Sequence, residues 1–136
     1  MTLTNLYALR AIYTAYNNKY YFASIIITLT CLASIVYHLS ETKHGMNSLC
    51  LTKYSDITLN IDRFLATIVG WTILWNFRHK INIELFVYDI ISLIAQGLSE
   101  SQHVIHLPLK TEKILYLNTH PVWHFCAFHC AYLLVK

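Results

Sequence analysis

The chain alternates between long apolar runs and short polar segments. The clearest runs cover residues 20–40, 56–77, 81–98 and 114–135. Each is close to the roughly 20 residues that an α-helix needs to cross a hydrocarbon core of about 30 Å. Since lipid offers no hydrogen-bond partner to the backbone, such runs predict helices. The expected fold class is all-α, an integral membrane helical bundle that passes through the bilayer several times.

A shorter apolar segment, residues 3–17, precedes these runs and carries Arg10 in its middle. It is either a short first span or a helix lying in the membrane interface, so the bundle has four to five helices. Lys19, Tyr20 and Tyr21 then mark a water–lipid boundary, since Tyr and Lys favour that depth. Arg10 and the lack of a following small-residue cleavage site argue against a cleavable signal peptide. The helices use most of the chain, so residues 1–136 are expected to form a single membrane domain.

Composition supports this interpretation. Hydrophobic residues make up 56% of the chain and charged residues 12%, against about half and about a quarter in soluble domains. Lys and Arg are scattered, so no nucleic-acid partner is expected. Cys31, Cys126 and Cys130 fall in apolar runs, where packing is the simplest role, and Cys50 lies in a polar segment. The expected partner is membrane lipid; the choice of membrane and a homo- or hetero-oligomeric state stay open.

Four costly polar groups share one depth in this arrangement. We call the end of the bundle that carries residues 41–55 end A, and the opposite end, end B. His38 lies two residues before the end-A limit of its run, and Asp62 lies about six residues into the next. Chain direction also places His120 and His124 in the half of the last run that starts at end A. All four groups then lie within roughly 15 Å of end A, at about 1.5 Å per residue.

Spacing within the runs predicts a metal site. His120 and His124 are four residues apart, as are Ser34 and His38, so each pair projects from one helical face. Two imidazoles from one helix and one from another suit zinc, which keeps a fourth position for water. We therefore predict His38, His120 and His124 as zinc ligands. Asp62 and Ser34 are the predicted catalytic residues, with Asp62 accepting a proton from the water and Ser34 holding the water or a substrate carbonyl.

Simpler interpretations exist for each residue. A pair of His four residues apart is common without a metal, and Asp62 can pair with Arg63. His129 is about half a helical turn out of phase with His120, so it is excluded from the site. A further polar stripe is interpreted as an inward seam between helices; its members are Asp89, Ser92 and Gln96.

The order of these motifs resembles a known family. Ser34 to His38, then Asp62, then His120 to His124 is similar to the S-x3-H, D and H-x3-H pattern of the CREST superfamily. That group contains alkaline ceramidases, progestin/adiponectin receptors, Per1-like proteins and myomaker-like proteins. The myomaker-like branch is the most similar, through the order and spacing of Tyr37-His38, Leu49-Cys50, Tyr54, Leu59 to Phe64 and Tyr116 to His124. The resemblance covers most of residues 19–77 and 116–135.

The resemblance implies a reduced form of a seven-span fold and zinc-dependent hydrolysis of a lipid amide or ester. It also implies the same three His ligands, with Asp62 and Ser34 beside the water. The alternative is a non-enzymatic, myomaker-like membrane remodelling or fusion protein, or a catalytically dead reduced homologue. Pro121 is expected in the first turn of the last helix, with Thr119 or His120 as its cap, which would take His120 out of the regular spacing.

Overall fold

The computed structural model describes residues 5–40, 52–100 and 109–136. Within these residues the chain forms five α-helices and two short 3-10 helices, and no strand. In chain order they are α2 (Tyr7–Asn17), α3 (Tyr21–Ser40), η1 (Thr52–Tyr54), α4 (Ser55–Asn76), η2 (Arg78–Lys80), α5 (Ile83–Glu100) and α6 (Leu109–Val135). The prediction of an all-α fold is confirmed.

The long helices lie close to the predicted runs, except at the start of α6. The limits of α3 and α4 agree with residues 20–40 and 56–77 to within one residue, and α5 is displaced by two. In contrast, α6 begins at Leu109, five residues before the predicted start. Pro121 therefore lies inside the helix, and the prediction that it belongs to the first turn was wrong. A proline in a helix interior lacks the N–H of one backbone hydrogen bond, and its ring crowds the carbonyl four residues earlier. Membrane-type helices tolerate such prolines, because other groups satisfy the freed backbone atoms.

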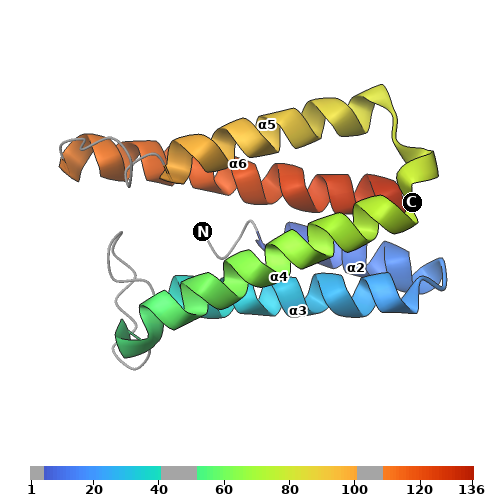
Figure 1. Cartoon of the computed structure of the whole chain (residues 1–136), viewed down its shortest axis with the longest axis horizontal. Coiled ribbons are helices and arrows are strands. Elements are labelled where there is room, and N and C mark those ends of the chain that lie inside the picture. The colour runs from blue at the N-terminus through green and yellow to red at the C-terminus, as the bar shows by residue number, and fades with distance from the viewer. Residues whose placement is uncertain (1–4, 41–51, 101–108) are drawn as a thin grey trace.

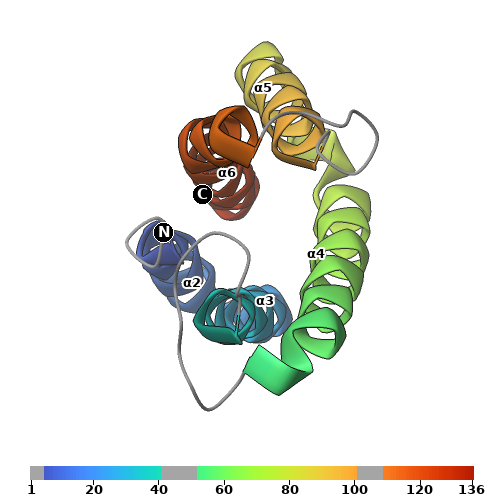
Figure 2. The same cartoon turned by 90° about the vertical axis from the view of Figure 1, so that its left-hand side faces the viewer.

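Helices that follow each other along the chain run in opposite directions along one axis (Figure 1). The closely packed pairs are α5 with α6, α3 with α4, and α2 with both α3 and α6. Viewed along the axis, α2 lies between α3 and α6, and α4 lies along the other side of the bundle, from α3 toward α5 (Figure 2). At end B, Asn18 donates a hydrogen bond of 2.7 Å to the carbonyl of Val135, so the α2–α3 turn meets the C-terminus of α6.

The short helix α2 lies alongside α3 rather than across its end (Figure 1). Its 11 residues extend about 16 Å, roughly half of a hydrocarbon core. Ala8, Ala11 and Ala15 are fully buried, and these small side chains let α2 pack closely between α3 and α6. The structure thus places α2 against α3 and α6, and whether residues 3–17 are a short first span or an interfacial helix stays open.

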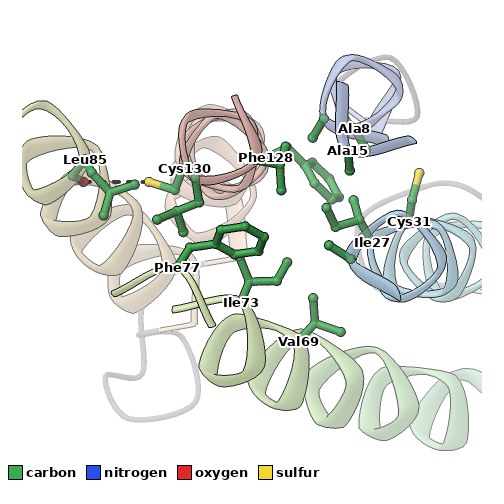
Figure 3. Close-up of a cluster of buried hydrophobic side chains, with 14 residues drawn as sticks. Ala8, Ala15, Ile27, Cys31, Val69, Ile73, Phe77, Leu85, Phe128 and Cys130 are labelled. Carbon is green, nitrogen blue, oxygen red and sulfur yellow. Dashed lines mark hydrogen bonds between the residues drawn. The ribbon is translucent and has the colours of Figure 1, made fainter. Parts of the chain in front are cut away.

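The bundle has an apolar core and an apolar exterior. Figure 3 shows side chains of α2, α3, α4, α5 and α6 meeting around Ile27, Ile73 and Phe128. The outer face of α4 exposes Trp71 (72%) and Trp75 (70%). Polar side chains, among them the three His of the predicted site, are instead buried. Two helices, α3 and α4, are long and apolar enough to cross a membrane on length and composition alone.

Candidate metal centre

Three histidines from two helices meet inside the bundle near end A. His38 lies in the last turn of α3, and His120 and His124 lie one turn apart on α6. The Nε2 atom of His38 is 3.1 Å from that of His124 and 3.3 Å from that of His120. The Nε2 atoms of His120 and His124 are 2.9 Å apart. All three side chains are almost completely buried, with exposed fractions of 0%, 4% and 4%.

Hydrogen bonds alone cannot satisfy this triangle of nitrogen atoms. Each Nε2 is either protonated, and then only a donor, or unprotonated, and then only an acceptor. Among three atoms with two states, at least one pair must be alike, and such a pair repels at about 3 Å. A cation at the centre removes the conflict, because all three Nε2 atoms then point their lone pairs at it. The arrangement is therefore the one that a metal ion satisfies.

The donor set fits zinc in both chemistry and dimensions. Zinc binds imidazole nitrogen at about 2.0–2.1 Å with tetrahedral geometry, which places neighbouring ligand nitrogens about 3.3 Å apart. The observed separations of 2.9, 3.1 and 3.3 Å lie close to that value. Imidazole also serves copper, iron and nickel, so the geometry indicates a metal site without fixing the element.

Aromatic rings hold the three imidazoles in place. Tyr116 stacks on His120 with ring centroids 4.5 Å apart, and the Trp123 ring lies 5.0 Å from His120 and 4.6 Å from His124. On α6 these residues lie four before and three after His120, so helical spacing brings them to the same face. The aromatic surroundings are apolar, which strengthens the interaction of the imidazoles with a cation.

The predicted catalytic residues lie on the wall of a cavity that reaches His124. Ser34, Asp62 and His124 all line this space of about 150 Å³, and Ser34 and Asp62 are 1% and 3% exposed. Three helices thus bring a hydroxyl, a carboxylate and an imidazole to the wall of one cavity. The catalytic roles of Ser34 and Asp62 stay predictions.

Asn5 is a site residue that the sequence did not reveal. It is 1% exposed, and its Nδ2 donates to Ser34 Oγ at 3.3 Å. The Ser34 hydroxyl can donate in return to Asn5 Oδ1 at 3.5 Å. The only sequence signal is a polar residue within the apolar segment 3–17, and the unsettled placement of that segment hid its depth.

The cavity continues from the metal centre toward end B. Ile27 lies seven residues before Ser34 on α3, Ile73 eleven residues after Asp62 on α4, and Leu134 ten residues after His124 on α6. At about 1.5 Å per residue, all three helices place its far wall roughly 10–16 Å from the metal layer. Apart from Thr30, Asp89 and Ser92, this part is lined by apolar and small residues. It is a narrow apolar space with its polar end at the metal centre.

Other polar residues of the helices lie outside the His triangle. His129 is not part of the His triangle; it accepts or donates a hydrogen bond of 3.0 Å with the Tyr7 hydroxyl instead. Ser92 is buried and donates to the carbonyl of Trp123 at 3.4 Å, so this seam residue joins α5 to α6. Asp89 lines the cavity with Ser92. The buried cysteines of the described residues are Cys31, Cys126 and Cys130; Cys50 lies outside those residues.

Comparison with known proteins gives one finding. A family model described as "Protein of unknown function (DUF3522)" matches residues 1–95. No curated protein and no solved structure matches the chain. The matched segment contains Ser34, His38 and Asp62 and ends before α6, which carries the other two histidines.

Proposed function

The chain belongs to the DUF3522 family of proteins of unknown function, and we propose that it is a multi-pass membrane hydrolase with a zinc ion on His38, His120 and His124. Its proposed substrate is a lipid with an amide or ester bond. The His triangle carries this proposal, because hydrogen bonding alone leaves two of its nitrogens in conflict. The same residues carry the resemblance to the CREST hydrolases.

The distribution of polarity supports embedding of the whole bundle in a membrane. Large apolar side chains are exposed on every long helix, for example Leu32 (52%), Phe64 (64%) and Ile94 (58%). His38 and Asp62 are buried. A soluble protein of this size rarely exposes so much contiguous apolar surface, whereas inward ionisable groups are the rule in membrane bundles. We therefore place α3, α4, α5 and α6 across the bilayer, with α2 reaching about halfway.

The proposed chemistry uses residues at the polar end of the cavity. A zinc ion held by the three imidazoles would supply a Lewis acid and an activated water. The Asp62 carboxylate would accept a proton from the attacking water and later return it to the leaving group. Ser34 would donate the single hydrogen of its hydroxyl to the oxygen on which negative charge develops. Asn5 orients that hydroxyl, because Asn5 Nδ2 donates a hydrogen bond to Ser34 Oγ.

The shape of the cavity favours a lipid over a soluble substrate. Ser34, Asp62 and His124 line its end-A part, and apart from Thr30, Asp89 and Ser92 the part toward end B is lined by apolar and small residues of α3, α4 and α6. A carbonyl at the metal would leave an attached acyl chain in this apolar part, removed from water. The reacting bond would lie near end A, where the helices meet the membrane surface.

Metal content is the first test. The full chain, purified in detergent, is assayed for zinc beside His38→Ala and His120→Ala/His124→Ala. We expect about one zinc per chain in the wild type and loss of that zinc in both variants. His129→Ala is the matched control, since His129 is a histidine on the same helix outside the triangle, and it should keep the metal. All variants are checked for helical content.

Hydrolysis of a lipid panel separates the two function classes. Release of a fatty acid from a lipid amide or ester by the wild type, lost together with zinc, would support the hydrolase. No zinc in a well-folded wild type would remove the proposed mechanism. Zinc binding without hydrolysis of any lipid would favour the non-enzymatic remodelling or fusion protein, in which the metal ties α3 to α6.

A further inference from the structure

A second polar cluster lies on the outer surface, in the groove between α2 and α6. Arg10 of α2 donates from Nη1 to the Tyr7 hydroxyl and from Nη2 to the Tyr132 hydroxyl, both at 3.0 Å. Its guanidinium also lies over the Tyr132 ring, with Cζ 4.0 Å from the centroid. Arg10 is exposed, so a cation in a fixed orientation faces the surroundings of the bundle.

The direction of the hydrogen bonds shows how the Tyr7 hydroxyl is held between Arg10 and His129. The Tyr7 hydroxyl accepts from Arg10, so its own hydrogen is available for His129 Nδ1 at 3.0 Å. His129 then serves as the acceptor. His129 is also packed against the rings of Tyr88 and Phe125, at 4.3 and 5.9 Å. The guanidinium is therefore held by a supported pair of hydroxyls, and it keeps further N–H groups for a ligand.

The charge of Arg10 has no acidic partner within residues 5–40, 52–100 and 109–136. Glu84 influences His129 electrostatically, but it forms no ion pair with Arg10. Arg10 lies seven residues before the end of α2, about 10 Å from end B. At that depth an exposed cation is costly unless it reaches water, a headgroup or a counter-ion. The positive charge of Arg10 therefore calls for an anionic ligand from outside the described residues.

A polar track connects Arg10 with end B. Tyr13 and Asn17 lie three and seven residues after Arg10, on the same face of α2, and both are exposed. Lys19 follows in the turn, and Lys136 lies beside it, since Asn18 donates to the Lys136 carbonyl at 3.2 Å. Headgroup oxygens can therefore approach Arg10 from end B along hydroxyl, amide and ammonium groups. These polar residues favour a lipid headgroup over an acidic side chain of a partner helix, because such a side chain could reach Arg10 without a polar path from end B.

We propose that Arg10, Tyr7 and Tyr132 form a binding site for the phosphate of an anionic phospholipid in the leaflet at end B. The guanidinium pairs with phosphate oxygens, which match its fork of donors. Tyr13 and Lys19 contact the remainder of the headgroup. This inference rests on the membrane embedding proposed above and is independent of hydrolysis, because the site lies on the outer face of α2 and α6.

Lipid retention measured by native mass spectrometry tests the site. The detergent-purified chain is titrated with phosphatidylglycerol, with phosphatidylcholine of the same acyl chains, and with inorganic phosphate alone. We expect phosphatidylglycerol to bind at least about tenfold more tightly than phosphatidylcholine, and Arg10→Gln to remove about that factor, as expected for loss of a hydrogen bond to a charged group. Arg78→Gln is the matched control. Arg78 is also an exposed end-B cation over an aromatic ring, that of Trp75 at 5.0 Å, but it lies outside the groove.

Several outcomes would overturn the site. These are equal binding of the two lipids, equal loss in Arg10→Gln and Arg78→Gln, and binding of free phosphate as tight as that of the lipid. A second protein that co-purifies with the wild-type chain, and is lost in Arg10→Gln, would be a rival ligand of Arg10. If the chain shows no preference for phosphatidylglycerol once that protein is gone, Arg10 pairs with a partner helix instead. Tyr7→Phe/Tyr132→Phe keeps the charge and removes the hydroxyls that orient it, so it should weaken the lipid preference severalfold even if Arg10→Gln fails to fold. Zinc is measured on the same samples and should not change, which separates failure here from failure of the hydrolase proposal.

Discussion

At the scale of single residues, Asp62 and the metal ligands must make different contributions if the hydrolase proposal holds. Asp62 lies in the cavity wall with Ser34 and His124. It does not belong to the group of side chains that could hold the metal. Asp62→Asn keeps size and hydrogen bonding but removes the proton acceptor. We expect hydrolysis to fall roughly 10²- to 10⁴-fold, with zinc content unchanged, as measured by metal analysis and fatty-acid release. Loss of zinc together with activity would instead make Asp62 part of the metal site.

The cluster of three histidines could be predicted from the sequence because two simple rules act on it. Helical spacing pairs His120 with His124, and alternating chain direction brings His38 to their depth. Asn5 could not be found in this way, because it contacts Ser34 only where α2 and the residues before it pack along α3. Contacts set by packing between helices have no periodic signal.

At the scale of helices, the width of the cavity depends on Gly70, a residue of its wall that has no side chain. Gly70 of α4 lines it, and a Cβ built there meets no atom within 4 Å. Gly70→Leu therefore adds a large side chain at the cavity wall without a clash at its Cβ, and we expect it to narrow the space proposed for the acyl chain. We expect hydrolysis of a long-chain lipid to fall at least about tenfold, while zinc content stays the same. The helix itself should gain up to about 1 kcal/mol in stability, since glycine disfavours helix.

Gly97 of α5 provides the matched control for this prediction. A Cβ at Gly97 also meets nothing within 4 Å, but Gly97 does not line the cavity. Gly97→Leu should raise the melting temperature in the same way and leave hydrolysis unchanged. If both variants lose activity equally, or if Gly70→Leu hydrolyses long-chain lipids normally, the cavity is not the acyl site.

Helix limits show where sequence patterns work and where they fail. The ends of α3 and α4 coincide with the change from apolar to polar residues, so they were predicted closely. The start of α6 was missed because residues 109–113 are mostly polar, yet good helix formers such as Leu, Lys and Glu extend the helix without burying an apolar face. Hydropathy reports the part of a helix that meets lipid or the core, and it says little about a helix that continues into water.

At the scale of the whole molecule, the ends of the bundle are unequal. His38 lies two residues from the end of α3, about 3 Å along the axis, whereas His120 lies eleven residues after the start of α6, about 16 Å. The first turns of α6 therefore extend past α3 at end A, as Figure 1 shows. If α3 spans the bilayer, the metal centre lies near the membrane surface, and the first turns of α6 lie in water beside it.

This geometry predicts that ends A and B lie on opposite sides of the membrane. In a variant whose four cysteines are replaced by alanine, single cysteines are introduced as Lys113→Cys at end A and Lys80→Cys at end B. Both lysines lie in the described residues, Lys113 in the first turns of α6 and Lys80 between α4 and α5. With a membrane-impermeant maleimide, sealed vesicles should label one of the two, and the other should react only after permeabilisation. Lys136→Cys should behave like Lys80→Cys, since the C-terminus meets the α2–α3 turn. Labelling of Lys113→Cys and Lys80→Cys from the same side would mean that the α5–α6 hairpin does not cross the bilayer, and His120 and His124 would then have to meet His38 outside the hydrocarbon region.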